Sequence, residues 1–199
     1  FYGACMNLLG SHDTQRILSC LSDAPPKDTL TREQQAEYQY KPEAVVRGKR
    51  RLYAAFALMF SMPQPPCIYY GDEAGMMGLS DPFNRGSYPW GREDIEIRSF
   101  VMQLSALRRR NAAMSSGKTA FAAPCADAFA VLRCRGEESA LTLVNRADHA
   151  VCAALSAEDF REGPDALNVR TADKYSDAFA DGTVLQKDLG TGHIKVEIP

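Results

Sequence analysis

The chain has 199 residues, of which 45% are hydrophobic and 24% are charged, a composition typical of folded globular proteins and not of disordered ones. Its 23 Lys and Arg residues against 25 Asp and Glu residues give a net charge of −2, and no basic stripe interrupts this balance, so we expect no nucleic-acid partner. No apolar segment approaches the roughly 18 to 20 residues that span a bilayer, so we expect no membrane partner, and nothing at the start of the chain is typical of a targeting peptide.

The cysteines are scattered and form no C-x-x-C pair, so the sequence predicts neither a zinc site nor a redox couple, and we expect no metal and no cofactor. Most have apolar neighbours, which favours buried free thiols over disulfides and, with them, a cytoplasmic location. The six are Cys5, Cys20, Cys67, Cys125, Cys134 and Cys152.

The first elements alternate between strand and helix. Residues 5–9 form an apolar run that predicts a buried strand, and the run Gly-Ser-His-Asp-Thr-Gln-Arg follows it at 10–16. Asp13 or Thr14 is then expected to cap a short helix over 15–21. A second helix is expected over 30–40, beginning at Thr31.

A longer helix is predicted over 43–62, where apolar residues recur at close to whole turns although Gly48 interrupts them. Prolines end it, and a strand follows at 67–70. The glycine-rich stretch 71–92 lacks periodicity and is expected to be a functional loop. The next helix has an apolar stripe from Ile97 to Leu107 and ends in Arg108, Arg109 and Arg110, which we expect to be solvated.

Beyond Gly117 the apolar period drops to two. A hairpin is predicted from 129–135 and 140–144, and further strands from 151–155, 183–185 and 193–198. This alternation is typical of a small antiparallel β domain, and we expect a sandwich. The predicted domains are therefore residues 1–117 and residues 118–199.

Two apolar runs each end in carboxylates, His12-Asp13 after the first and Asp72-Glu73 after the strand at 67–70. Catalytic groups of parallel α/β barrels lie at the carboxyl ends of strands, so this placement suits an active site. By itself a His-Asp pair before a helix is more often a cap with a surface histidine. The aromatic residues Tyr69, Tyr70 and Trp90 are expected in the core rather than as platforms for sugar rings.

Residues 6–14 resemble the segment that ends barrel strand seven in the α-amylase family of glycoside hydrolases, and 66–75 are similar to its strand-eight motif. The stretch Asp-Pro-Phe-Asn-Arg at 81–85, with Tyr-Pro-Trp at 88–90, resembles the following loop in the neopullulanase, cyclomaltodextrinase and maltogenic amylase branch. Ser11 before His-Asp favours the same branch. The resemblance covers essentially the whole chain and is strongest up to Gly117.

This resemblance implies an α/β plus all-β fold, the carboxyl-terminal portion of a (β/α)8 TIM barrel followed by an antiparallel β-sandwich. Asp13 would be the family's third catalytic carboxylate, which binds sugar hydroxyls at the cleavage site, and His12 would contact the same sugar. Asp81 and Arg85 would grip the next glucose, and Glu73 would be a buried structural carboxylate. The nucleophile and the general acid would lie on earlier strands, upstream of Phe1.

The chain is therefore expected to be a carboxyl-terminal fragment of a retaining hydrolase that acts on α-1,4 and α-1,6 links of cyclodextrins, pullulan and maltooligosaccharides. Its expected partner is an α-glucan oligosaccharide, and alone it is expected to hydrolyse nothing. A part-barrel would leave apolar surfaces open, so self-association is expected. The alternative is a non-catalytic module, in which the β domain binds oligosaccharide or supports a barrel.

Overall fold

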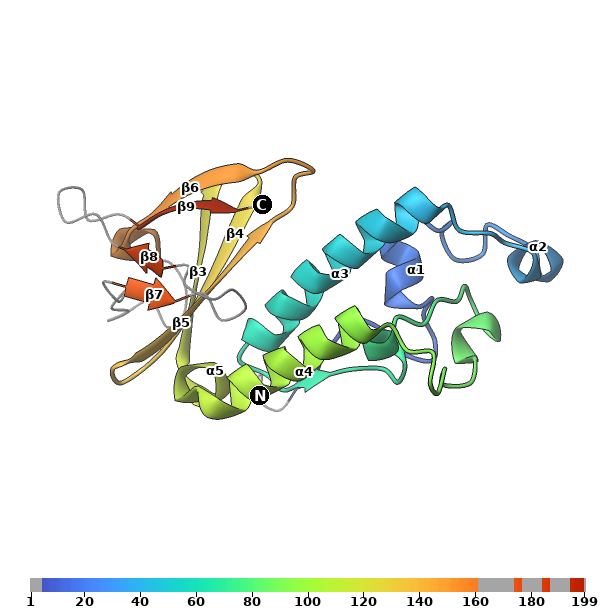
Figure 1. Ribbon diagram of the computed structural model, residues 1–199, viewed down its shortest axis with the longest axis horizontal. Helices are drawn as coiled ribbons and strands as arrows, with labels where there is room; N and C mark the ends of the chain where they lie inside the picture. The colour runs from blue at the N-terminus through green and yellow to red at the C-terminus, as the bar shows by residue number, and fades with distance from the viewer. Residues whose placement is uncertain (1–4, 161–173, 177–183, 187–193, 199) are drawn as a thin grey trace. The chain divides into compact units, whose positions relative to one another are not determined.

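A computed structural model describes residues 5–160, 174–176, 184–186 and 194–198 of the chain (Figure 1). The chain divides into two compact units. Unit 1 contains residues 1–59 and 64–102, and unit 2 contains residues 60–63 and 103–199. Among the described residues, no helix has both the length and the apolar character needed to cross a bilayer.

Unit 1 contains a short parallel ladder. Strand β1 (Asn7–Leu8) pairs with β2 (Pro66–Cys67), with Asn7 opposite Pro66 and Leu8 opposite Cys67. A strand therefore exists in each predicted region, and the two are parallel, but each has only two residues. The second begins at Pro66 and ends at Cys67, so residues 68–70 of the predicted strand are not strand. The prediction that the first is buried is wrong, because Met6 and Leu8 are 61% and 52% exposed. A ladder this short gives its apolar side chains little to pack against.

Two short helices follow β1. Helix α1 (Ile17–Leu21) has Arg16 at its N-cap without a side-chain capping bond, so the predicted cap by Asp13 or Thr14 is wrong. The Thr14 hydroxyl accepts instead from the Ser11 backbone N–H, which belongs to the turn before the helix. Helix α2 (Arg32–Ala36) begins after Thr31, which forms a capping box with Gln34, and it ends at Ala36, well short of the predicted end at residue 40.

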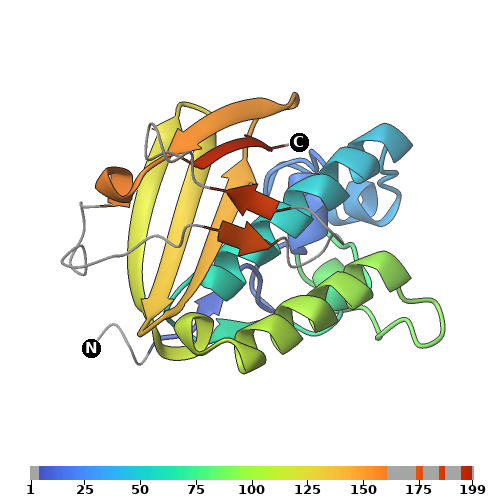
Figure 2. The ribbon, with the colours of Figure 1, turned by 60° about the vertical axis from the view of Figure 1, so that its left-hand side comes forward.

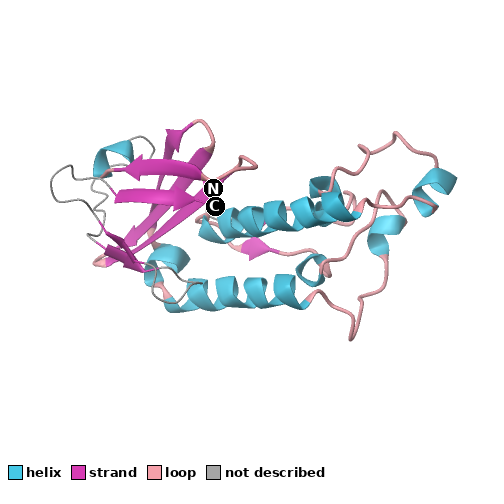
Figure 3. Ribbon diagram, turned by 45° about the horizontal axis from the view of Figure 1, so that its top comes forward, coloured by secondary structure: helices cyan, strands magenta, loops and turns pink. Residues whose placement is uncertain are grey.

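The two long helices, α3 (Pro42–Ser61) and α4 (Ile95–Arg110), confirm their predicted positions and run side by side in Figure 3. In unit 1 they are joined by an edge-on contact of the Tyr53 and Phe100 rings, with centroids 4.9 Å apart. Each helix also carries buried apolar side chains, Leu52, Phe56 and Met59 on α3 and Ile97 and Val101 on α4. A Cβ on Gly48 would lie 2.0 Å from the Ser22 hydroxyl oxygen, so close packing of α3 explains this helix glycine.

The loop between β2 and α4 carries two 3-10 turns, η2 (Asp72–Ala74) and η3 (Phe83–Arg85). Gly71 and Gly75 flank η2 with φ angles of +86° and +74°, a backbone region that other residues rarely adopt. The glycine-rich composition of this stretch therefore reflects its turns.

Unit 2 contains helix α5 (Ala112–Ser116) and a three-stranded antiparallel sheet of β3 (Lys118–Cys125), β4 (Ala128–Arg135) and β5 (Glu138–Asn145), shown in Figure 2. The predicted hairpin is confirmed as β4 and β5. Strand β3 was not predicted, because its alanines and a proline give only a weak apolar alternation.

The remaining strands of unit 2 form two pairs. β6 (Val151–Leu155) pairs with β9 (Ile194–Ile198), and β7 (Lys174–Ser176) pairs with β8 (Val184–Gln186). The 3-10 turn η4 (Ala157–Phe160) lies between β6 and β7. β6 matches the predicted strand 151–155, and β9 lies within the predicted strand 193–198. β8 overlaps the predicted strand 183–185 and extends one residue beyond it. Residues 183 and 193 lie outside the described residues, and β7 was not predicted. Buried Leu155 and Phe160 pack with Ala130 and Leu132 of β4, so the β6–β9 pair shares a core with the three-stranded sheet.

The prediction that Arg108 is solvated is wrong. Its guanidinium is half-buried and donates to the backbone carbonyls of Phe60, Met62 and Pro63 at the end of α3. Burial lowers the pKa of Arg108. Arg109 and Arg110 are exposed as expected.

All six cysteines lie among the described residues, none of them is in a disulfide, and none is fully buried. Cys5, Cys20 and Cys152 are exposed, and the other three are half-buried. The expectation of buried thiols is therefore wrong, because an apolar sequence neighbourhood does not fix which face of a short strand or helix a residue occupies.

Candidate functional site

Four polar residues from two distant segments of unit 1 form one exposed cluster, named here the rim cluster. Arg85 Nε lies 3.1 Å from Asp81 Oδ1, and Arg85 Nη2 lies 4.0 Å from Asp13 Oδ1. His12 Nε2 lies 3.3 Å from the other carboxylate oxygen of Asp13. The structure thus brings together all four predicted site residues, and their side chains remain accessible, with Asp13 72% exposed.

The turn after β1 presents Asp13 to solvent. The Ser11 hydroxyl accepts a hydrogen bond from the Asp13 backbone N–H at 3.2 Å, and the Thr14 backbone N–H donates to the Ser11 carbonyl at 3.3 Å. The Ser11 and Thr14 hydroxyls thus form their hydrogen bonds with backbone groups of the same turn, as serine and threonine side chains commonly do. The carboxylate of Asp13 is left to face outward.

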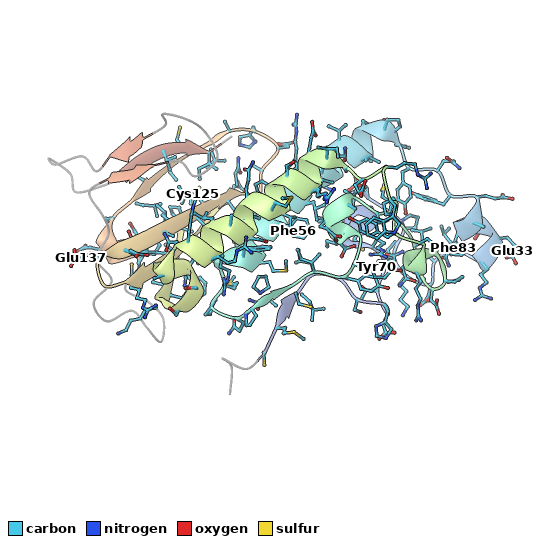
Figure 4. All side chains as sticks on the ribbon, turned by 60° about the horizontal axis from the view of Figure 1, so that its bottom comes forward. Glu33, Phe56, Tyr70, Phe83, Cys125 and Glu137 are labelled. Carbon is cyan, nitrogen blue, oxygen red and sulfur yellow. The ribbon has the colours of Figure 1, made fainter. Side chains whose placement is uncertain are left out.

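The η3 turn presents the other half of the rim cluster. The Arg85 backbone N–H donates to the Pro82 carbonyl at 3.1 Å, and Asp81 and Arg85 stand four residues apart, close enough to pair. The Tyr70 hydroxyl donates to the Gly86 carbonyl at 2.9 Å and ties this turn to the segment after β2. Tyr70 and Phe83, labelled in Figure 4, mark these two segments.

A fully buried ion pair lies behind the rim cluster. Arg16 Nη1 is 3.1 Å from Asp72 Oδ1, and the two side chains are 0% and 2% exposed. The Arg16 guanidinium lies 4.3 Å and 4.6 Å from the ring centroids of Tyr69 and Tyr70, within cation–π range, and also donates to the Tyr70 carbonyl. Arg16 therefore holds the start of α1 against the segment that follows β2.

Burial raises the pKa of Asp72 to about 6, although the Arg16 guanidinium opposes that rise. The Asp72 carboxylate also lies close to the backbone of Gly10, where an added Cβ would be 2.9 Å from Asp72 Oδ2. Gly10 thus allows the turn that carries Asp13 to pass close to the buried carboxylate.

Sequence reasoning assigned the structural role to the wrong carboxylate. Asp72 is the buried, paired acid, whereas Glu73 is half-buried, and its Oε2 is buried without a hydrogen-bond partner among the described residues. The neighbouring negative charge of Glu73 contributes, after desolvation, to the raised pKa of Tyr88. Arg16 is the last residue of the run 10–16 that follows the first strand. A buried arginine rarely lacks a charged partner, so this residue was the signal that could have pointed to a paired acid such as Asp72.

The expectation that the aromatic residues belong to the core is also wrong. Trp90 is 81% exposed and Tyr70 is 41% exposed. Trp90 lies on the loop before α4, where its ring meets that of Tyr88 with centroids 4.5 Å apart. Tyr69 is half-buried beside Arg16.

The rim cluster combines two carboxylates, which accept hydrogen bonds, with a guanidinium, which donates them. Such a set matches a ligand dense in hydroxyl groups, since each hydroxyl both donates and accepts. Within the described ranges, no three His, Cys, Asp or Glu side chains come together as a metal site.

Comparisons with known proteins identify the family of the chain. No protein-family model matches the chain. The chain is 32% identical over 210 residues to an amylopullulanase from Thermoanaerobacter thermohydrosulfuricus, a match that covers 96% of the chain and 14% of that protein. It is 31% identical over 152 residues to a cyclomaltodextrinase from Geobacillus thermopakistaniensis, covering 74% of the chain and 22% of that protein. This chain belongs to the α-amylase family.

The predicted family is thereby confirmed, and the chain spans less than a quarter of the length of these two α-amylase family relatives. Among solved structures of the family, the cyclic α-maltosyl-(1→6)-maltose hydrolase from Arthrobacter globiformis, in complex with that cyclic sugar, is 25% identical. Its TM-score is 0.61, and the match covers 100% of this chain and 36% of the hydrolase. The fold is accordingly a mixed α/β structure with a small antiparallel sheet that corresponds to about a third of that hydrolase.

Proposed function

We propose that the rim cluster is part of the sugar-binding site of a retaining α-glucan hydrolase, which cleaves α-1,4 and α-1,6 links of cyclodextrins, pullulan and maltooligosaccharides. In this proposal Asp13 binds hydroxyls of the glucose at the cleavage point, and His12 contacts the same sugar. Asp81 and Arg85 bind the next glucose. The observation that carries the proposal is that these four side chains, from two distant segments, form one accessible cluster.

The spacing within the rim cluster suits a bridging hydroxyl. A separation of 4.0 Å between Arg85 Nη2 and Asp13 Oδ1 is too long for a direct hydrogen bond. A sugar hydroxyl between them could accept from the guanidinium and donate to the carboxylate. The shorter contact of Arg85 with Asp81 fixes the orientation of the guanidinium for this exchange.

Two relationships support the choice of an α-glucan. The Arthrobacter globiformis hydrolase has been solved with its cyclic maltose-derived substrate and also with maltose. The curated relatives include both an amylopullulanase and a cyclomaltodextrinase. Retaining hydrolysis needs a nucleophilic carboxylate and a carboxylic acid about 5 to 5.5 Å apart. In the proposal both of these groups come from outside the present sequence, and the chain alone binds glucan without cleaving it.

The finer architecture is part of the same proposal. Residues 1–117 would be the last strands and helices of a (β/α)8 barrel, which the parallel β1–β2 pair with intervening helices supports. Residues 118–199 would be a β-sandwich, supported by the core shared between the three-stranded sheet and β6. Exposed Met6 and Leu8 support self-association, and the free thiols support a cytoplasmic location.

Calorimetric titration of the chain with maltotriose tests the sugar site. We expect a dissociation constant of about 1 mM, equivalent to about 4 kcal/mol. Arg85→Ala should weaken binding by about tenfold or more. Arg146→Ala is the matched control, because Arg146 also pairs through Nε with an aspartate, Asp127, at 3.1 Å on unit 2. Equal binding by the wild type and Arg85→Ala would refute the site.

Two further assays test the remaining parts. The chain alone should release no reducing sugar from cyclodextrin, pullulan or starch, and measurable release would contradict the assignment of the nucleophile and acid elsewhere. Light scattering across a wide concentration range should show self-association. A monomer at every concentration would contradict that part of the proposal.

A further inference from the structure

The side chain of Asn84 holds the backbone on both sides of Asp13. Asn84 lies in η3 and is 1% exposed. Its Nδ2 donates to the carbonyl of His12 at 2.8 Å and to the carbonyl of Thr14 at 2.7 Å. Both amide protons of this one nitrogen are therefore used, one on each neighbour of Asp13.

Asn84 is itself fixed from behind. Arg16 Nε donates to the Asn84 backbone carbonyl at 2.7 Å, and the Arg16 backbone N–H donates to the Gly78 carbonyl at 3.0 Å. Arg16 in turn is held by Asp72. The η3 turn is thus joined to the turn after β1 by a buried chain of hydrogen bonds.

We propose that Asn84 is a positioning residue that sets the gap between Asp13 and Arg85 and thereby the affinity of the rim cluster for sugar, an inference that rests on the proposed function. Asn84 precedes Arg85 directly, so the same turn points one side chain inward at the backbone around Asp13 and the next outward at its carboxylate. A change in either hydrogen bond of Asn84 would alter the Asp13–Arg85 separation.

The residue type at this position follows from the bonds that it makes. Two carbonyl oxygens need two donors from a short, uncharged side chain, which asparagine provides. An aspartate of the same shape would place oxygen against both carbonyls, and an alanine would leave the two carbonyls without these donors.

The test measures maltotriose affinity for Asn84→Asp and Asn84→Ala. Asn145→Asp is the matched control, because Asn145 Nδ2 also donates to two carbonyls, those of His149 at 2.7 Å and Ile198 at 3.2 Å, but in unit 2. Both Asn84 variants should weaken binding about tenfold, because the separation between Asp13 and Arg85 is no longer fixed, whereas Asn145→Asp should leave the affinity unchanged. Unchanged affinity in both Asn84 variants would overturn the inference.

A double-mutant cycle separates positioning from general destabilisation. If Asn84 acts through Asp13, Asn84→Ala should change the affinity less than about twofold when Asp13→Asn is already present. The same tenfold loss in both backgrounds would show that the effect does not pass through Asp13.

Backbone NMR spectra test the positioning role of Asn84 even if the wild type does not bind maltotriose. In Asn84→Ala the amide signals of His12, Asp13 and Thr14 should shift or broaden, while those of β4 should not move. Unmoved signals at these three residues would overturn the positioning role even if the wild type binds maltotriose. An absence of binding by the wild type, with the signals moved, would instead refute the proposed function alone.

Discussion

Unit 1 contains two arginine–carboxylate pairs that differ in their exposure to solvent. Arg16 and Asp72 are almost completely buried, whereas Arg85 and Asp81 are 45% and 57% exposed at nearly the same separation. Exposed pairs contribute little to stability because water and salt screen them. Breaking a buried pair leaves an unpaired charge in the interior, which is strongly destabilising. The same chemistry therefore serves architecture in one place and leaves groups available to a ligand in the other.

Substitution of each arginine in turn tests whether the buried pair and the exposed pair differ in their contribution to stability. Arg16→Met should lower the free energy of unfolding by about 3 to 5 kcal/mol, because Asp72 is left buried and unpaired. Arg85→Met should change it by less than about 1 kcal/mol. Thermal melting followed by circular dichroism would show the difference as about 4 °C or more between the two variants. Similar melting temperatures would contradict the division of roles.

The pH dependence of stability gives a second contrast. Because the pKa of Asp72 is raised to about 6, the folded state binds its proton more tightly than the unfolded state does, where the pKa is 3.8. Its effect on stability is therefore most favourable below about pH 4 and is lost as the pH rises through 6. The contribution of Asp72 should fall by up to about 3 kcal/mol over this range.

Urea denaturation between pH 4 and pH 7 measures this effect. Asp72→Asn should remove that part of the slope, and Asp13→Asn should leave the slope as it is in the wild type. Superimposable pH profiles for the wild type and Asp72→Asn would contradict the account of the buried carboxylate.

Gly10 connects the two regions, and its substitution should have an intermediate effect. Gly10→Ala would bring a methyl group to 2.9 Å from Asp72 Oδ2, and we expect a loss of about 1 to 2 kcal/mol in stability. Gly86→Ala is the control, since its Cβ would meet only Met76 at 3.5 Å, an ordinary contact. Comparable denaturation midpoints for the two variants would show that the turn does not depend on this close approach.

The smallest effect on stability is expected in the rim cluster itself. Asp81→Ala removes an exposed pair and should change the free energy of unfolding by less than about 1 kcal/mol. Asp127→Ala, which removes the exposed partner of Arg146, provides the matched measurement in unit 2. Calorimetry should nevertheless show weaker maltotriose binding for Asp81→Ala only. A large loss of stability in Asp81→Ala would mean that the rim cluster is structural.

The sequence was sufficient to locate the exposed cluster but not the buried pair. His12, Asp13, Asp81 and Arg85 lie in segments that resemble a known family, and the structure places them together. Their roles remain predictions. Asp72 was passed over for its neighbour Glu73 because adjacent acids carry the same sequence signal, and only the path of the backbone decides which one points inward.

The fold shows the same division. Long amphipathic helices such as α3 and the clear β4–β5 hairpin were predicted because their apolar spacing is regular over many residues. The alanine-rich β3 was not predicted, and the two-residue β1 was wrongly predicted to be buried. The structure and burial of short or weakly alternating segments depend on the residues that pack against them.

An NMR titration of the chain with maltotriose tests the central claim most directly, because it locates the sugar rather than only measuring affinity. We predict that the largest chemical-shift changes fall on the backbone around Asp13 and on η3, with Asp81 and Arg85 among them. Changes confined to the strands of unit 2, or spread without a centre, would contradict the assignment of the rim cluster as the sugar site.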